Sequence, residues 1–453
     1  MDYTSGIGGL NVEKDESVDS NFDLFGKTEY EVGVKKLVSQ IFRPLSSPNT
    51  TGPFTFKIPS DPDKFTNAQS LRLHGRMPIK KRDRQTEALT NLSNEYVAPI
   101  NNIFDSLWSS ISIKLNGCEI TDTSSKWYAY KAYFENHISY SSSCKENVLS
   151  YRGYYKDSAG KFDEVGNSTS QTASTNAGFI KRKELFAGSQ WVYFAINLHS
   201  DITTLRKYIP PGIQIELEFQ RNVNKFCLLS DIHEDNYAIE IDDLRLKVDR
   251  IIPSEKVEDF YKKNIENKLS PRLPIDRSLL KTYIVNKGLF DLSEYNIITG
   301  NQLPDQVIVG IVDHDANMGI IGKNPFNFKD YDISEASLVV NGMHEPQELY
   351  KMYKSAGDKV DMYANFLENT GISTDDREIG ITMEDYYGGS FILAWDRTQD
   401  KCNRFHRHIT DSGALSINLK TRTALPNNVT VIVYATYSKD LIIDGDRVLT
   451  AAF

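Results

Sequence analysis

The sequence predicts an all-β protein with a few short helices, built from two tandem eight-stranded antiparallel β-sandwiches. The first observation behind this prediction is an internal duplication, in which two distant stretches of the chain follow the same plan. Each stretch is a strand that ends in Asn-Gly, at Asn116-Gly117 and at Asn341-Gly342. Each is followed by the pattern Tyr-x-x-[Tyr/Phe]-[Phe/Leu]-Glu-Asn, at 130–136 and at 363–369. The repeated order predicts two similar domains in one chain.

A third element completes each copy, because a proline precedes an alternating strand at 210–219 and again at 426–434. The second observation is this alternation itself, since a period of two places one face of a strand inward and the other outward. The third is that the strands follow one another without the regular helices of a parallel sheet. Antiparallel sandwiches are therefore favoured, and eight-stranded jelly rolls fit the strand count.

The composition indicates a folded protein whose stability needs neither disulfides nor metals. The 453 residues include 24 Tyr and 22 Phe, and two sandwiches of this size can bury ample apolar surface. Cys118, Cys144, Cys227 and Cys402 lie far apart without a CxxC pair, so reduced thiols are expected. The N-terminus lacks the basic start and apolar centre of a secretory signal. No apolar run approaches the ~18–20 residues that cross a bilayer, so no membrane-spanning segment is expected.

The formal net charge of −9 argues against a protein that coats nucleic acid. Phosphate binding depends on clustered Lys and Arg side chains. The basic runs here, at 80–84, 181–183 and 401–408, are short and are typical of solvated loops. We therefore expect no specific nucleic-acid binding, and the negative charge suits a protein that must stay soluble before it assembles.

Residues 1–40 are predicted to form an N-terminal arm, because this Gly-rich and acidic stretch carries few large apolar residues. The first jelly roll is placed at 41–250. Its Asn116-Gly117 pair is the preferred sequence of a type I′ hairpin, since both positions need positive φ. The strands expected in this half are 54–58, 71–77, 111–115, 191–198, 213–219 and 239–248.

Aromatic residues at helical spacing predict a short helix over 127–139, lying over one edge of the sandwich. The Gly-, Ser-, Thr- and Asn-rich loop at 158–180 is unusually long for a compact domain, and such loops tend to be either exposed and functional or disordered. A connector is placed at 251–280, where Ser254 is the predicted N-cap of a helix that reaches about Leu269. The second jelly roll is placed at 281–453. The strands expected there are 307–312, 338–340, 390–395, 414–419 and 429–437.

Two polar clusters contain the residue types of a catalytic or metal-binding site. Asp313-His314-Asp315 has the residue types of an acid–base or metal site, but it follows a buried-type strand and is interpreted as a turn. His406 and His408 share one face of an extended segment, yet no third ligand follows at the spacing a cupin would need. No phosphate-binding glycine loop, GxSxG or HExxH occurs. We therefore predict no catalytic residue, no cofactor-binding residue and no metal ligand, and the protein is not expected to be an enzyme.

Several motifs recur in a fixed order across the two halves of the chain. In the first half they are 101–117, 128–133 and Tyr151-Arg-Gly-Tyr-Tyr-Lys-Asp157. In the second half they are 324–333, which leads into the second Asn-Gly pair, and 387–396. Taken in this order, they resemble the hexon-like major capsid proteins of Polinton (Maverick) elements and adintoviruses. The similarity extends from about Asp23 to the C-terminus, but leaves 1–22 and 158–180 unmatched.

The resemblance implies a double jelly roll that forms homotrimeric capsomers with a pseudo-hexameric outline, which tile an icosahedral shell. The implied partners are neighbouring capsomers, single jelly-roll penton proteins and minor capsid proteins. The implied location is the virion capsid, assembled inside the host cell in the nucleus or the cytoplasm. The helices near 127–139 and 362–369 and the loop 158–180 are then expected at the top of the trimer or between subunits.

Two other classes remain open. A cellular tandem β-sandwich that binds carbohydrate or protein would need an exposed aromatic platform, for which the segment 151–155 is the candidate. A hydrolase on a jelly-roll scaffold would need the Asp313 and His314 groups, or His406 and His408, to converge on one site. The oligomeric state of the protein distinguishes these classes, since binding modules are commonly monomeric whereas a capsid subunit must associate.

Overall fold

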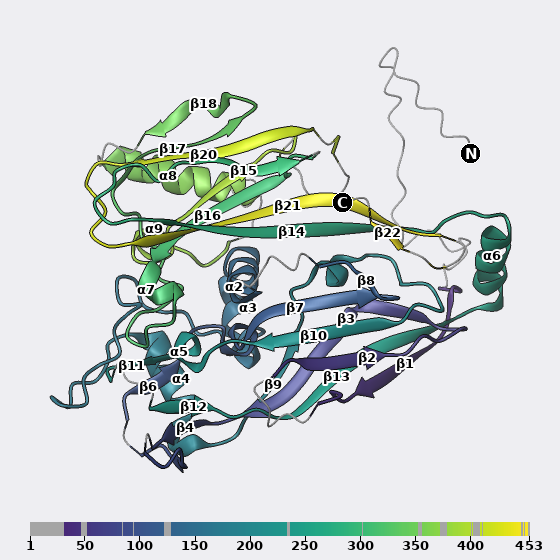
Figure 1. Ribbon diagram of the computed structural model, residues 1–453, viewed down its shortest axis with the longest axis horizontal. Helices are drawn as coiled ribbons and strands as arrows, with labels where there is room; N and C mark the ends of the chain where they lie inside the picture. Colours follow the sequence, from purple (N-terminus) through teal and green to yellow (C-terminus); the bar gives the residue numbers. More distant parts are fainter. Residues whose placement is uncertain are drawn as a thin grey trace, which may run out of the picture.

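The computed structural model describes residues 31–451, except for 47–51, 84, 94, 122–127, 233–235, 301, 352–355, 372–377, 400, 402–407, 410, 445–446 and 448. The first 30 residues, which make up most of the predicted arm, therefore lie outside the described residues. The described chain forms two stacked β-sandwiches (Figure 1). Helix α2 lies between the sandwiches, and α6 lies at one end, in the connection from the first to the second (Figure 1).

The first sandwich consists of two four-stranded sheets in which all neighbours are antiparallel. Sheet I has the order β1(Val34–Phe42), β13(Asp242–Pro253), β3(Phe65–Met77), β9(Val192–Asn197), and sheet II the order β2(Phe54–Ile58), β10(Ile215–Arg221), β7(Trp108–Leu115), β8(Cys118–Glu119). Two small sheets extend it, namely β11(Leu228–Ser230) with β6(Val97–Pro99), and β12(Tyr237–Ile239), β4(Ile79–Arg82), β5(Leu89–Asn91).

The second sandwich repeats this plan. Sheet III has the order β14(Arg272–Val285), β21(Val429–Ile443), β16(Gln306–Asp313), β19(Ile392–Asp396), with β22(Leu449–Ala451) beside β21. Sheet IV has the order β15(Glu294–Gly300), β20(Gly413–Thr421), β17(Ile333–Val340), β18(Met343–Lys351). With eight main strands counted along the chain, both sandwiches have one sheet in the order 1-8-3-6 and one in the order 2-7-4-5. The two halves therefore share one topology, as the internal duplication predicts.

The helices are short and lie mainly in connections. They are α1(Ile103–Ser106), α2(Tyr128–Ser139), α3(Ser142–Glu146), α4(Ala177–Leu185), α5(Asn224–Cys227), α6(Glu255–Glu266), α7(His314–Asn317), α8(Ala356–Asn369) and α9(Met383–Tyr387), with 3-10 turns η2(Ser150–Arg152), η3(Ala187–Ser189) and η4(Asp201–Thr204). Ser254 is the N-cap residue of α6, as predicted. Among the described residues, no helix combines the length and the apolar character that a membrane crossing requires.

The two Asn-Gly pairs occupy equivalent places in the two sandwiches. Asn116 and Gly117 have φ of 48° and 80°, and Asn341 and Gly342 have φ of 50° and 86°, so both pairs form the predicted hairpin turn. Each turn joins the fourth strand of its sandwich to the fifth, and α2 or α8 follows it. These two elements of the duplication are therefore confirmed.

The third element of the duplication is not equivalent. The strand after 210 is β10, the seventh of its sandwich, whereas the strand after 426 is β21, the eighth. The true counterpart of β10 is β20. The prediction failed because a proline and an alternating pattern describe one strand locally, and neither specifies its place in a sheet.

The structure has a strand, β1, ahead of 54–58, which is the first strand that the sequence pattern predicts. β1 runs from Val34 to Phe42 at the edge of sheet I, and none of its residues is fully buried. Strand patterning depends on one face being buried, so an exposed edge strand gives a weak signal. Sheet III shows the opposite case, since all residues of β16 from Val307 to Val312 are buried. A strand covered on both faces reads as a continuous apolar run, and this observation locates the contact between the sandwiches.

Candidate functional site at the junction of the sandwiches

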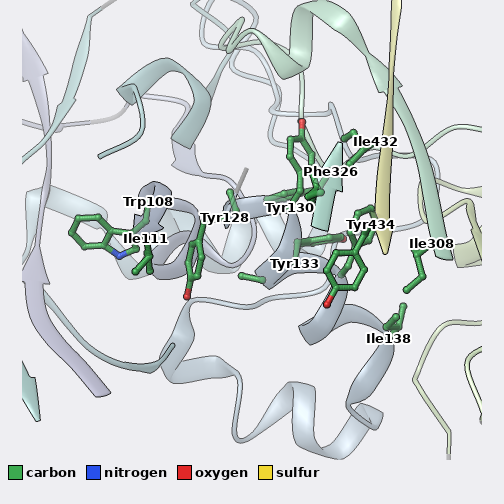
Figure 2. Close-up of a cluster of buried hydrophobic side chains, with 14 of the residues drawn as sticks. Trp108, Ile111, Tyr128, Tyr130, Tyr133, Ile138, Ile308, Phe326, Ile432 and Tyr434 are labelled. Carbon is green, nitrogen blue, oxygen red and sulfur yellow. The ribbon is translucent and has the colours of Figure 1, made fainter. Parts of the chain in front are cut away.

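The junction between the two sandwiches is built around α2. Ten of its twelve residues are buried, including the polar Lys131, Asn136 and His137. Tyr133 of α2 lies beside Tyr434 of β21 in sheet III, whereas Tyr128 lies beside Ile111 of the first sandwich (Figure 2). The helix therefore lies between the two sandwiches of one chain, so the expectation that it covers a sandwich edge or lies between subunits is wrong, whereas its place at the top of a trimer stays a prediction. The sequence pattern could not separate these places because the helix is aromatic on several sides.

Stacked aromatic rings form the apolar part of the junction. Tyr133 stacks on Phe326 with ring centroids 4.0 Å apart and an interplanar angle of 7°. Phe134 lies 5.2 Å from Phe328 and 6.2 Å from Tyr434. Such pairs stabilise a core beyond the area they bury, by about 0.5–1.5 kcal/mol each. The rings bind α2 of the first half to β21 and to the loop before β17 in the second half.

Gly310 lets these rings approach the sheet. A Cβ atom at this position would lie 2.6 Å from the Phe328 ring and 3.2 Å from the Phe134 ring. Any side chain here would force both rings away from β16. Close approach of another element is a common reason for glycine within a strand.

A buried polar network accompanies the rings. The Lys131 ammonium donates to the Asp201 carboxylate at 2.6 Å and to the Ser278 hydroxyl of β14. Glu135 accepts from the Tyr434 hydroxyl at 2.9 Å and contacts the His199 ring at 2.5 Å. Directional contacts of this kind fix an orientation more tightly than apolar contacts, which tolerate sliding.

The charges in this network are mutually stabilised. Burial alone raises the pKa of the Glu135 carboxyl, but Lys131 and His199 outweigh burial and lower that pKa to about 2. Burial alone likewise lowers the pKa of the Lys131 ammonium, but Asp201 and Glu135 raise it. Both groups are therefore charged at neutral pH. A Lys and a Glu four residues apart in an otherwise aromatic helix is a signal that could have identified them.

A second buried ion pair lies beside the loop 158–180. The Arg182 guanidinium contacts the Asp157 carboxylate at 2.7 Å, and neither side chain is exposed. Arg182 also donates to the carbonyls of Pro99 and Tyr155. Asp157 accepts from the Asn176 amide at 2.9 Å. This pair holds α4, β6 and the loop together.

The loop 158–180 contacts the second sandwich directly. Asp163 accepts from the backbone N–H of Asn324 at 2.7 Å and from the Asn327 amide at 2.6 Å. The Asn324 amide donates to the carbonyl of Phe162, and the N–H of Gly160 donates to the carbonyl of Gly388. This part of the loop thus ties the two sandwiches of one chain together, and its expected place at the trimer top or between subunits stays a prediction. The low-complexity composition concealed the buried Asn and Asp contacts.

Lys145 is a buried amine at the same junction. It donates to the carbonyl of His137, at the end of α2, and to the carbonyl of Ile379 in the second half. Burial and the nearby Lys156 lower the pKa of this ammonium to about 7. It is therefore largely neutral in mildly alkaline solution, in contrast to an exposed lysine.

This pKa predicts a pH dependence of stability. Between about pH 7 and pH 10 the unfolded chain retains a proton on Lys145 that the folded chain releases, so this residue makes the unfolding free energy rise with pH. A Lys145→Met variant is expected to lose that contribution. The measurement is chemical denaturation of both proteins at about pH 7 and pH 9. Parallel pH profiles of the two proteins would contradict the assignment.

The Asp313-His314-Asp315 cluster, considered above as a possible acid–base or metal site, makes structural contacts. The Asp313 carboxylate caps α7 by accepting from the N–H of Asp315 at 2.9 Å, and both carboxylates contact Lys323. The His314 ring contacts the Thr430 hydroxyl at 2.9 Å. The segment therefore ends β16 and forms the one-turn helix α7 in place of the turn that was expected. His406 lies outside the described residues, and the His408 ring contacts Gln399.

The described part of the chain can be compared with what a metal site and a glycan-binding aromatic platform would each require. Within it, no group of three or more His, Cys, Asp or Glu side chains could hold a metal ion. Cys118, Cys144 and Cys227 are free thiols, and burial raises the pKa of Cys227 to about 12. In the proposed aromatic platform, Tyr154 is buried, and its hydroxyl contacts the His137 ring at 2.9 Å. The segment 151–155 therefore does not present a continuous aromatic surface.

Comparison with known proteins shows the fold. No protein-family model matches the chain. An uncharacterized protein of Caenorhabditis elegans is 23% identical over 408 residues, which cover 87% of this chain and 92% of the relative.

Among solved structures, a chain of the Sputnik virophage matches with a TM-score of 0.61 at 13% identity, covering 98% of this chain and 93% of that one. The Faustovirus major capsid protein matches with a TM-score of 0.57 at 9% identity, covering 92% of each chain. The mavirus major capsid protein matches with a TM-score of 0.52 at 10% identity, covering 98% of this chain and 96% of that one. The predicted all-β double jelly roll is therefore confirmed over nearly the whole chain.

Proposed function

We propose that this chain is a structural protein, the major capsid protein of an icosahedral virion. The observation that carries the proposal is the pairing of two jelly rolls of identical topology through a buried junction in one chain. This chain matches the virophage chain and the two major capsid proteins over 92–98% of its length. Because these matches include both sandwiches, they support the proposal. On this proposal the protein has no enzymatic activity.

Symmetry supports a homotrimer as the building block. Three copies of a chain with two similar sandwiches present six nearly equivalent sides, and such a unit tiles a surface. Cyclic symmetry is the usual way in which one interface satisfies itself. The junction described above holds the two sandwiches of each chain in a fixed relation, which a pseudo-hexameric outline requires.

The finer assignment is to the hexon-like capsid proteins of Polinton elements and adintoviruses. The motif order across both halves supports this assignment, and a relative in a nematode fits an element carried by an animal genome. The proposed partners are neighbouring capsomers, single jelly-roll penton proteins and minor capsid proteins. The proposed location is the virion capsid, assembled inside the host cell, with the residues ahead of β1 contacting neighbouring capsomers as an arm.

The mass of the purified protein tests this proposal. Light scattering is expected to give three times the chain mass of 51.5 kDa, and negative-stain images of the same fraction should show a hexagonal outline. A binding module would be monomeric. A stable species of 51.5 kDa at micromolar concentration would therefore contradict the capsomer and favour a glycan-binding or protein-binding sandwich.

A further inference from the structure

We propose that a cavity beside α6 binds a basic peptide segment of a partner protein, anchored by one large apolar side chain. This α6 cavity has a volume of about 280 Å³. Three parts of one chain line it, namely α6 itself, the segments that lead into β3 and β10 of the first sandwich, and the end of β21 in the second. It lies at the end of the molecule where the two sandwiches are connected (Figure 1). Since the cavity is complete within one chain, the inference goes beyond the proposed function and does not depend on it.

The lining of the α6 cavity is mostly apolar. Phe65 and the Tyr261 ring of α6 meet edge to face, with ring centroids 5.3 Å apart. Ile213 and Ile443 are buried, and Ile265 of α6 is half-buried. The other apolar residues are Pro62, Pro210, Pro211 and Pro253. A concave site with a mainly apolar lining and a few polar groups is the usual form of a ligand pocket, and this one has room for a single large side chain.

Backbone hydrogen bonds hold the lining segments of the first sandwich in place. The N–H of Thr66 donates to the carbonyl of Ile209, and the N–H of Ile209 donates to the carbonyl of Thr66, both at 2.9 Å. The N–H of Gly212 donates to the carbonyl of Asp61 at 2.7 Å. The α6 cavity is therefore preformed, and a preformed site lowers the entropic cost of binding.

Carboxylates outnumber cations around the α6 cavity. The charged residues of the lining are Asp63, Glu258, Glu266, Asp444, Lys262 and Arg447. The Lys262 ammonium is already paired with the Glu258 carboxylate at 2.5 Å. Asp63 and Glu266 make no ion pair with any other residue that the structure describes. A ligand with positive charge is therefore favoured, because opposite charges steer encounter and fix register.

Two polar groups of the lining can bind the backbone of a peptide. Among the described residues, neither the Tyr261 hydroxyl nor the Arg447 guanidinium has a hydrogen-bond acceptor. A Cβ atom at Gly212 would lie 2.1 Å from this guanidinium, so glycine leaves the space that Arg447 occupies. Both groups are donors, and the carbonyl oxygens of a bound peptide are the acceptors that match them.

Charge also distinguishes a partner from the chain's own N-terminal residues. The first 30 residues join the described structure beside α6, because the carbonyl of Gly33 accepts from the N–H of Ser254 at 2.9 Å. They carry seven acidic and two basic residues. Their net charge has the same sign as the lining of the cavity. The occupant is therefore a segment of another protein, in which Lys or Arg flanks an aromatic or large aliphatic residue.

Three short peptides test this chemistry on the full-length protein. Fluorescence anisotropy measures the binding of labelled Lys-Lys-Phe-Lys-Lys, of Lys-Lys-Ala-Lys-Lys, which lacks the anchor, and of Glu-Glu-Phe-Glu-Glu, which reverses the charge. The first peptide is expected to bind about tenfold more tightly than either of the others. Equal binding of all three, or no binding of the first at millimolar concentration, would overturn the inference. Tighter binding of the acidic peptide would assign the cavity to an acidic segment, such as the chain's own first 30 residues, and would also overturn it.

Variants of α6 locate the site. Ile265→Lys fills the cavity with a cation and is expected to weaken binding of Lys-Lys-Phe-Lys-Lys by about tenfold or more. Phe260→Lys is the matched control, because it adds the same charge to the same helix at a side chain that is 69% exposed and lies outside the lining. Equal denaturation midpoints establish that both variants fold. Glu266→Lys, at the exposed end of α6, reverses one charge without touching the core and should also weaken binding.

The outcomes separate this inference from the proposed function. Loss of binding in Ile265→Lys and Glu266→Lys, with binding retained in Phe260→Lys, supports the site. An equal loss in Phe260→Lys would mean that only the overall charge matters, and the site would fail. A monomeric protein that binds the basic peptide would contradict the capsomer alone, whereas a trimer that does not bind it would contradict this inference alone.

Discussion

Replacement of Asp157 by alanine is expected to lower the unfolding free energy by about 3–5 kcal/mol. The reason is that Arg182 would keep its charge in a fully buried site while losing the carboxylate that balances it. The carbonyls of Pro99 and Tyr155 would remain as its only described acceptors. Chemical denaturation of the purified protein measures the change.

Two further variants make this result interpretable. The double variant Asp157→Leu/Arg182→Met is expected to regain most of the loss, because replacing both partners of a buried pair is often neutral. Lys420→Ala at the partly exposed Lys420–Glu335 pair is the matched control, and should change stability by no more than about 1 kcal/mol. A single Asp157→Ala variant as stable as this control would show that the buried pair does not hold the loop.

Local features of the fold could be predicted from the sequence. The hairpins at Asn116-Gly117 and Asn341-Gly342 are specified by their own positive-φ residues, and the strands by alternation within a few residues. The double jelly roll could be predicted because these signals recur in the same order. The proline-led pattern nevertheless equates β10, the seventh strand of the first sandwich, with β21, the eighth strand of the second. The reason is that a local pattern carries no information on the order of strands in a sheet.

The junction could not be predicted in the same way. Asp157 and Arg182 are 25 residues apart, on either side of a polar loop, and resemble ordinary surface charges in sequence. Lys131 meets Asp201 and Ser278 only because the two sandwiches pack together. Long-range pairing of buried polar groups is set by the tertiary arrangement, and a single sequence does not record it.

The polar network has a consequence for assembly. Aromatic contacts around Tyr133 and Phe326 supply adhesion between the sandwiches, whereas the bonds from Lys131 and Glu135 to β14 and β21 specify one orientation. The proposed capsomer, with its pseudo-hexameric outline, would depend on that orientation, because an error in the angle within one chain would be repeated three times around the ring. The junction is therefore the part of the subunit where loss of packing should affect assembly most.

Phe134→Ala is expected to show this effect. The ring is buried against Phe328 and Tyr434, so its removal should lower the unfolding free energy by about 3–5 kcal/mol. Phe260→Ala on the outer side of α6, where the ring is 69% exposed, is the control and should change stability by no more than about 0.5 kcal/mol. Denaturation gives the stability, and light scattering gives the fraction of trimer at the same temperature.

The two readouts together test the role of the junction. If the angle between the sandwiches determines closure of the ring, Phe134→Ala should lose trimers at temperatures where the chain is still folded. A variant that is destabilised but forms trimers up to its unfolding midpoint would mean that the remaining contacts of α2, from Tyr133, Lys131 and Glu135, maintain the angle. Adding Lys131→Met to Phe134→Ala would then be expected to weaken the trimer, because α2 would have lost one aromatic contact, with Phe328, and one polar contact, with Ser278, to the second sandwich.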